Sequence, residues 1–378
     1  MTIKNTYSSA AIAGVVALGL VIGSAPAVNA ADKVLVVAVE APLTGSQASS
    51  GRDMLRGVQL AARQVNAKGG VLGMRVKVVR VDDRANPDLA AASVTKAVAA
   101  GAFAVVGPYN SSVGVINLPT YLKEKIVPVQ MTSTNDTNGL GVTVQPKNNQ
   151  IAPTEIDYLS RSSGCPKVVM LVDPSSYTQG MANRVGKAMV CGDGVPVTSI
   201  SIEEGLDNYT SQVAEALALN PDELYISTYY PEGAKIAQAI AAANSKVSCL
   251  MGLANVDPGF ISSAGLTASQ RCVFSGLPEA GQMPGAKARA YTQQYTKEFK
   301  KTPGVWGIFT YDSANLLFKQ IETAGKADFN AVMKKLKNTK NYRGATGTIT
   351  INPKTGNRKD VPVYILKVNN QGAYEPIS

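Results

Sequence analysis

Ala102-Phe103-Ala104-Val105-Val106-Gly107, followed closely by Asn110-Ser111-Ser112, has the pattern of a buried strand that ends in small polar residues. The pattern recurs along the chain. Residues 126–129 lead to Thr132-Ser133-Thr134, residues 168–172 lead to Asp173 and Tyr177, and residues 224–227 lead to Tyr229 and Tyr230. Ligands of open α/β sheets bind outside the carboxyl ends of the strands, so these positions indicate a site at that edge.

Strand and helix patterns alternate on both sides of this region, which is typical of parallel sheets covered by helices on both faces. The first series has strands at 34–39, 76–81, 102–107 and 126–131, with helices at 52–66, from Pro87, and at 112–123. The second series has strands at 167–172, 197–202, 223–229, 247–253 and 271–275, with helices at 179–190, 209–219, 233–244 and 257–265. The sequence therefore predicts an α/β fold with two Rossmann-like lobes.

The order of the segments predicts how the lobes are joined. A loop at 132–150 separates the two series, and helices at 286–300 and 308–324 return the chain to the first lobe. The tail, 348–351 and 361–368 around a turn, predicts a β-hairpin. We expect one lobe from residues 31–149 and 277–345, the other from 150–276 and 346–378, and a multi-strand hinge that permits closure.

Residues 1–30 have the pattern of a signal peptide. Lys4 precedes an uncharged apolar run, and small residues up to Ala30 provide a cleavage site. The apolar run is shorter than the roughly 20 residues that a transmembrane helix needs. We expect cleavage near Ala30 and a periplasmic protein, without a lipid anchor because no cysteine lies near that site.

The formal net charge of +10 does not indicate nucleic-acid binding. Most cations are interspersed with acids, and the densest basic cluster has no aromatic residues within it to stack on bases. That cluster is Lys334, Lys335, Lys337, Lys340 and Arg343.

Four cysteines allow three disulfide pairings in an oxidising compartment. Cys165 and Cys191 flank one strand–helix unit, and Cys249 and Cys272 flank another, so we expect the pairs Cys165–Cys191 and Cys249–Cys272. A zinc site is not expected, because the chain has no CxxC motif and no histidine.

Short motifs in a fixed order resemble the periplasmic substrate-binding proteins of ABC transporters for branched-chain amino acids, which have the type I two-lobe fold. The resemblance covers essentially the whole chain after residue 30. Its motifs are residues 41–45 (Ala-Pro-Leu-Thr-Gly), 65–73 (Val-Asn-Ala-Lys-Gly-Gly-Val-Leu-Gly), Asp82-Asp83, Gly107 with Ser111-Ser112, Thr132-Ser133-Thr134, and residues 229–232 (Tyr-Tyr-Pro-Glu).

The resemblance implies a ligand site between the lobes. Ser111 or Ser112 begins a helix, where free N–H groups and the helix dipole favour a carboxylate. With them, the resemblance assigns Thr132, Ser133 and Thr134 to the ligand's carboxylate and amino groups. From the second lobe it assigns Tyr177 and one of Tyr229 and Tyr230, since alternation directs only one of the pair inward.

Two departures from the family pattern leave the ligand open. Leucine-type members carry a glutamate for the ligand's ammonium where Ala254 stands here, and Asn255 and Asp257 are the candidate substitutes. An aromatic residue of the first loop is replaced by Ser50. The ligand is therefore a branched-chain or related amino acid, or else a small carboxylate such as an aromatic acid, or an amide.

Catalysis is not expected. The chain lacks histidine, the commonest general base, and it has no GxSxG, phosphate-loop or dinucleotide motif after a strand. We expect no cofactor and no metal. The expected partners are a small molecule and an ABC permease of the inner membrane, with the chain acting as a monomer; a soluble binding subunit of a sensor is the alternative.

Overall fold

The computed structural model describes residues 1–6, 33–161, 165–190 and 197–377. The chain divides at Lys33, and Lys33–Ser378 forms one compact unit. The proposed signal peptide falls almost entirely on residues 7–32, which lie outside the described residues, so it stays a prediction. Within the part of the chain that the structure describes, no helix combines the length and the apolar character needed to cross a membrane.

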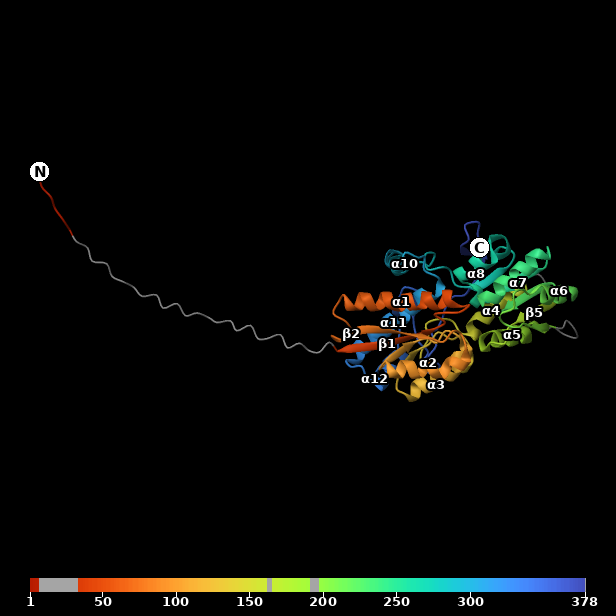
Figure 1. Ribbon diagram of the computed structural model, residues 1–378, viewed down its shortest axis with the longest axis horizontal. Coiled ribbons are helices and arrows are strands. Elements are labelled where there is room, and N and C mark those ends of the chain that lie inside the picture. The colour runs from red at the N-terminus through yellow and green to blue at the C-terminus, as the bar shows by residue number, and fades with distance from the viewer. Residues whose placement is uncertain (7–32, 162–164, 191–196, 378) are drawn as a thin grey trace. The chain divides into compact units, whose positions relative to one another are not determined.

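The first sheet has four parallel strands in the order β2-β1-β3-β4. They are β1 (Val34–Ala41), β2 (Arg75–Asp82), β3 (Ala104–Val106) and β4 (Val127–Val129). Alternating side chains divide between its faces. Ala38 and Val105 pack with α2 (Ala90–Ala99) and α3 (Ser111–Lys123). The other face packs with α1 (Ala48–Asn66) and α11 (Val305–Ala324), which lie side by side in Figure 1.

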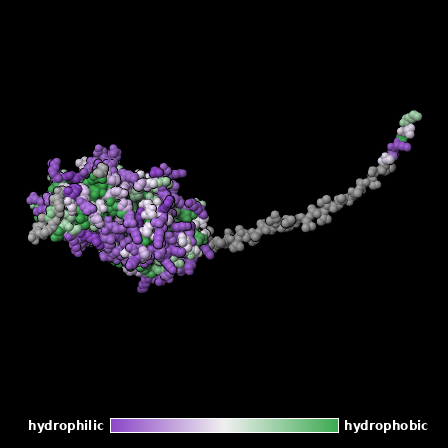
Figure 2. All heavy atoms as spheres, turned by 180° about the vertical axis from the view of Figure 1, so that it is seen from behind, coloured by the Kyte–Doolittle hydropathy of each residue, from purple (hydrophilic) through white to green (hydrophobic). Residues whose placement is uncertain are grey.

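The second sheet has seven strands in the order β13-β12-β9-β8-β7-β5-β6. Its parallel part is β5 (Val168–Val172), β6 (Thr198–Ser201), β7 (Glu223–Ser227), β8 (Ser248–Met251) and β9 (Val273–Gly276). The helices between these strands are α5 (Ser176–Met189), α6 (Thr210–Ala218), α7 (Tyr230–Ala242), α8 (Pro258–Ala264) and α9 (Leu266–Ser269). In Figure 1 these helices gather around the second sheet. Figure 2, which shows the molecule from behind, has mostly hydrophilic residues on its surface.

Three segments cross between the two sheets: residues 130–147, 277–285 and 350–363. The second leads to α10 (Ala286–Phe299), α11 and α12 (Phe329–Lys337), which pack on the first lobe. The first and third crossings lie side by side, since Thr143 and Asn357 form an isolated parallel bridge. The predicted α/β class and the two lobes joined by several crossings are confirmed.

The predicted tail hairpin is wrong. β11 (Gly347–Ile349) pairs with β10 (Tyr342–Gly344), whereas β12 (Tyr364–Val368) pairs antiparallel with β9 and with β13 (Tyr374–Pro376). Only the bridge between Ile351 and Arg358 remains of the expected pairing. Strand alternation identifies a strand but not its partner, and β12 gains more by extending a large sheet than by forming an isolated two-stranded ribbon.

Two helical regions were not predicted. The expected loop at 132–150 contains η2 (Asn135–Thr137) and the start of α4 (Asn148–Leu159), a helix that includes Pro153. The basic cluster lies largely on α12, whose buried face is formed by Val332, Met333 and Leu336. The lysines of that helix are therefore the exposed side of an ordinary amphipathic helix.

The disulfide Cys249–Cys272 is confirmed. Cys191 lies outside the described residues, so the pairing Cys165–Cys191 stays a prediction.

Candidate functional site

A small cavity lies between the carboxyl edges of the two sheets. Its lining comes from both lobes: Tyr109, Ser111, Met131, Ser133, Gln145, Tyr177, Tyr229, Leu253, Ala254 and Trp306. Its volume is only about 10 Å3, close to the space that one water molecule needs. A solute larger than water can therefore enter only if the lobes or the lining side chains move.

Ser111 is the first residue of α3 and is almost completely buried. Gly107 permits the turn that leads to it, because a Cβ atom there would lie 2.0 Å from the carbonyl oxygen of Glu40. The preceding residue, Asn110, donates to Gln47 Oε1 (2.9 Å) and makes no side-chain cap within the described structure. No side chain among the described residues therefore caps α3, although the Tyr229 hydroxyl of the other lobe accepts from the backbone N–H of Ser111. The helix dipole favours an anion at this end of the helix.

The turn after β4 presents one of its three predicted side chains to the cavity. Ser133 lines it, and the Ser133 hydroxyl accepts from Gln145 Nε2 (3.2 Å). Thr132 instead contacts Thr137 Oγ1 (2.7 Å), and Thr134 Oγ1 donates to Asp136 (3.1 Å). Thr132 and Thr134 thus hold the turn in shape. The backbone N–H of Thr134 donates to Ser111 Oγ (3.2 Å), which joins the turn to α3.

Tyr177 and Tyr229 provide the second lobe's side of the cavity. Their ring centroids are 5.8 Å apart, and the Tyr229 ring packs edge-on against Tyr109 of the first lobe at 5.9 Å. Asp173, whose pKa is raised by burial, accepts from the backbone N–H of Tyr229 (3.0 Å) and fixes the end of β7. The sequence left open which of Tyr229 and Tyr230 points inward. Tyr229 lines the cavity, and Tyr230 does not.

Asn255 and Ser112, two other predicted site residues, lie outside the cavity lining. The Asn255 amide donates to the carbonyls of Thr228 (2.9 Å) and Gly252 (3.2 Å), so it holds its own loop. Its neighbour Ala254 lines the cavity. Ser112 Oγ accepts from the backbone N–H of Ser176 in the other lobe (2.9 Å).

Two further hydrogen bonds join the lobes beside the cavity. The Tyr230 hydroxyl donates to the carbonyl of Ser46 (2.6 Å). The Ser50 hydroxyl donates to the buried carboxylate of Asp257. Ser50, noted as a departure from the family pattern, therefore connects the lobes, and Asp257 is engaged with it. With the Ser112–Ser176 bond, these contacts hold the lobes together.

Sequence reasoning missed three polar residues of the cavity: Tyr109, Gln145 and Trp306. The Tyr109 and Tyr177 hydroxyls, Gln145 Oε1 and Trp306 Nε1 are all buried and have no hydrogen-bond partner within the described structure. Buried polar atoms in native proteins are nearly always hydrogen-bonded. Their convergence on one cavity indicates a place where a ligand supplies the missing partners. Tyr109 could have been found from its position between Gly107 and Ser111.

The cavity contains no charged side chain. Glu155 lies behind it, but it accepts from the hydroxyls of Tyr225 (2.7 Å) and Ser275, and burial raises its pKa to about 7. Across the part of the chain that the structure describes, no group of three or more acidic or cysteine side chains could hold a metal ion.

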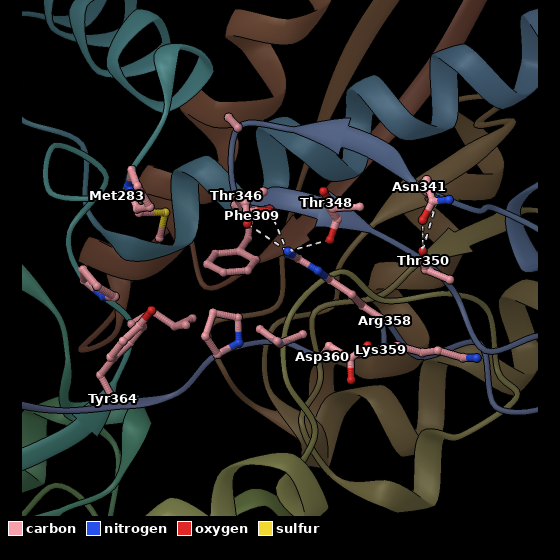
Figure 3. A pocket seen from close by; sticks show the side chains of 17 residues that line it. Met283, Phe309, Asn341, Thr346, Thr348, Thr350, Arg358, Lys359, Asp360 and Tyr364 are labelled. Carbon is pink, nitrogen blue, oxygen red and sulfur yellow. Dashed lines mark hydrogen bonds between the residues drawn. The ribbon is translucent and has the colours of Figure 1, made fainter.

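A second cavity, of about 420 Å3, lies away from these residues among the crossing segments (Figure 3). Arg358 reaches from one crossing toward the Thr346 hydroxyl (2.9 Å) and the Thr348 carbonyl (3.1 Å). Its guanidinium also donates to the Val144 carbonyl (3.3 Å) of another crossing. Arg358 therefore ties the crossings together, and none of the predicted ligand residues lines this cavity.

A family model described as "Periplasmic binding protein" matches residues 35–373. The chain belongs to the periplasmic binding protein family. Members of this family bind solutes, and the predicted resemblance is confirmed.

This periplasmic binding protein has relatives with named ligands. The Leu/Ile/Val-binding protein BraC3 of Rhizobium johnstonii is 27% identical over 325 residues, which cover 84% of this chain and 87% of that protein. The leucine-binding protein LivK of Thermotoga maritima has the same fold, with a TM-score of 0.81 at 24% identity, covering 91% of this chain and 98% of that one. A solute-binding protein from Rhodopseudomonas palustris, solved in complex with 3,4-dihydroxybenzoic acid, has a TM-score of 0.80 at 21% identity. The match covers 91% of this chain and 96% of that one.

Proposed function

We propose that this chain is an exported solute-binding protein of an ABC importer, which traps a small amino acid-like solute between its lobes and delivers it to a permease. The observation that carries this proposal is the set of partnerless polar atoms around the interlobe cavity. In the proposed closure, residues 31–149 and 277–345 move as one lobe, and residues 150–276 and 346–378 move as the other. The protein acts in the periplasm, without chemical change of its ligand.

The arrangement suits a carboxylate at the first lobe. The Ser111 hydroxyl and the positive end of the α3 dipole lie at one side of the cavity, beside Ser133, whose hydroxyl donates to the carbonyl of Pro146 (3.1 Å). A carboxylate there would receive hydrogen bonds in place of its hydration, and hydrogen bonds to charged groups are the stronger kind. The hydroxyls of Tyr109 and Tyr177 and the indole N–H of Trp306 would bind further acceptor atoms of the solute.

Two ligand classes fit the remainder of the cavity. A branched-chain or related amino acid would place its ammonium near Gln145 Oε1 or over an aromatic ring, because the lining offers no carboxylate. The second candidate is a small aromatic carboxylate. It is favoured by the rings of Tyr109, Tyr177, Tyr229 and Trp306, which would stack on it, and it needs no partner for an ammonium.

A thermal-shift panel followed by native mass spectrometry tests the proposal. Leucine, isoleucine, 4-hydroxybenzoate and 3,4-dihydroxybenzoate are compared with their amides, which lack the carboxylate. We expect at least one acid to raise Tm and to be recovered unaltered with the protein, and its amide to bind more weakly. Equal binding of acid and amide would contradict the carboxylate site, and turnover of the ligand would contradict the binding function.

A further inference from the structure

Lys147 is a completely buried lysine at the boundary between a crossing segment and α4. Its Nζ atom donates to Gln130 Oε1 (3.0 Å), to the carbonyl of Thr134 (3.1 Å) and to Thr137 Oγ1 (2.7 Å). Thr132 Oγ1 lies 3.4 Å from it. The ammonium group is therefore surrounded by neutral oxygen atoms, all from the segment that contains the ligand-binding turn.

No carboxylate forms an ion pair with Lys147 within the described residues. Asp136 acts on it from η2, but its carboxylate accepts from Thr134 Oγ1. The other charged groups on neighbouring elements have partners of their own. Asp312 accepts from Ala345 and Thr346, and Arg358 donates to Val144 and Thr346. Glu155 accepts from Tyr225 and Ser275. A buried, unpaired ammonium is costly unless an anion compensates it.

Lys147 lies directly behind the proposed carboxylate position. It binds the carbonyl of Thr134, whose own N–H donates to Ser111 Oγ. The next residue, Asn148, donates its backbone N–H to the carbonyl of Ser133 (2.8 Å) and its side-chain amide to the carbonyl of Tyr177 (3.1 Å). The charge of Lys147 is thus separated from the cavity by a single turn of backbone.

We propose that Lys147 is a positioning residue that holds the Ser133–Thr134 turn and supplies the positive charge for the ligand's carboxylate, so that carboxylate binding is coupled to proton uptake by Lys147. This inference rests on the proposed function, because it requires a carboxylate at Ser111 and Ser133. It adds that charge selection in this protein comes from behind the cavity wall.

The direction of the pH dependence follows from the environment of Lys147. Burial lowers its pKa to about 7, against a smaller opposite effect of Asp136. A carboxylate bound nearby favours the charged form and raises this pKa again. The complex therefore binds more protons than the free protein at pH 7–8, and by linkage the affinity for a carboxylate falls as pH rises through that range.

Isothermal titration calorimetry tests the coupling. Isoleucine and 4-hydroxybenzoate are titrated into the wild-type protein at pH 7.5 in phosphate and in Tris, whose ionisation enthalpies differ. We expect the heat of binding to depend on the buffer in the direction of proton uptake, and the affinity to fall by up to about tenfold per pH unit above 7. Heats that do not depend on the buffer would overturn the proposal and leave the binding function intact.

The variant Lys147→Met tests whether the proton taken up on binding goes to Lys147. The methionine side chain is unbranched, uncharged and one atom shorter, and we expect weaker carboxylate binding with no dependence on buffer. Lys123→Met, at an exposed lysine of α3, should behave as the wild type. Buffer dependence that persists in Lys147→Met would overturn the assignment, and if this variant does not fold, the wild-type buffer series still decides. If neither probe binds at all, both this proposal and the ligand classes proposed above fail.

Discussion

The hydroxyl of Tyr230, in the first turn of α7, donates to the backbone carbonyl of Ser46, 2.6 Å away and in the other lobe. The neighbouring Tyr229 packs its ring on Tyr109 across the same gap. Two adjacent tyrosines therefore have different tasks: Tyr229 lines the cavity, and Tyr230 joins the lobes beside it. A contact that exists only when the lobes meet contributes to ligand affinity through the closure equilibrium.

Tyr230→Phe removes that contact without changing the cavity lining. A net hydrogen bond contributes about 0.5–1.5 kcal/mol, so we expect ligand affinity to fall about two- to tenfold. Small-angle scattering should show a decrease in radius of gyration on ligand binding in the wild type, and the variant should need more ligand to reach it. Tyr364→Phe, at a partly exposed tyrosine of β12, is the control. An unchanged radius in the wild type with a proven ligand would count against closure.

Ser111→Ala tests the carboxylate position. Losing a hydrogen bond to a charged group costs about 1.5–3 kcal/mol, so affinity for the bound acid should fall about 10- to 150-fold. The amide of the same ligand should be affected much less. Calorimetry gives both affinities, and a cooperative thermal transition shows that the variant is folded. Ser262→Ala on the outer helix α8 is the matched control; full acid affinity in Ser111→Ala would remove this serine from the site.

The sequence could predict the lobes and part of the candidate site, because both depend on local patterns. Buried apolar runs ending in hydroxyl residues located Ser111, Ser133, Tyr177 and Tyr229 at one edge, since parallel strands place their carboxyl ends together. The threonines flanking Ser133 could not be separated from it, because the Thr132 side chain turns to the buried amine of Lys147 and the Thr134 side chain to Asp136.

The remaining site residues depend on contacts between distant segments. Trp306 lies in the first turn of α11, and its place at the cavity follows from the packing of that helix on α1 after the chain has returned to the first lobe. Gln145 lies in a crossing segment with no periodic pattern. The wrong tail hairpin has the same cause, since the partner of β12 is β9, whose position in the sequence is far away.

A buried acidic cluster of the first lobe predicts an unusual pH dependence of stability. Burial, with a contribution from Asp83, raises the pKa of Glu40 from its ordinary 4.5 to about 8, and burial raises that of Asp83 to about 7. Both acids are therefore protonated in the folded protein at pH values where the unfolded chain ionises them. Their contribution to the free energy of unfolding is complete only below the ordinary pKa values, 3.8 for Asp83 and 4.5 for Glu40, and it is lost as pH rises toward 8.

Glu40→Gln checks this contribution. The amide keeps an oxygen for the hydrogen bond that Asn117 donates to Glu40, and it cannot ionise. We expect Tm of the wild type to fall between pH 5 and pH 8, and the fall to be smaller in the variant. Glu124→Gln, at an exposed glutamate, should reproduce the wild-type curve. A parallel curve for Glu40→Gln would show that this carboxyl does not carry the effect.

Fluorescence of Trp306 reports whether the solute is bound in the cavity between the lobes. Trp306 is the single tryptophan of the chain, and it lines that cavity with a partnerless indole N–H. Titration with an acid that raises Tm should produce a saturable change in its emission, with the dissociation constant found by calorimetry. Calorimetric binding with unchanged Trp306 emission would place the ligand elsewhere and contradict the account.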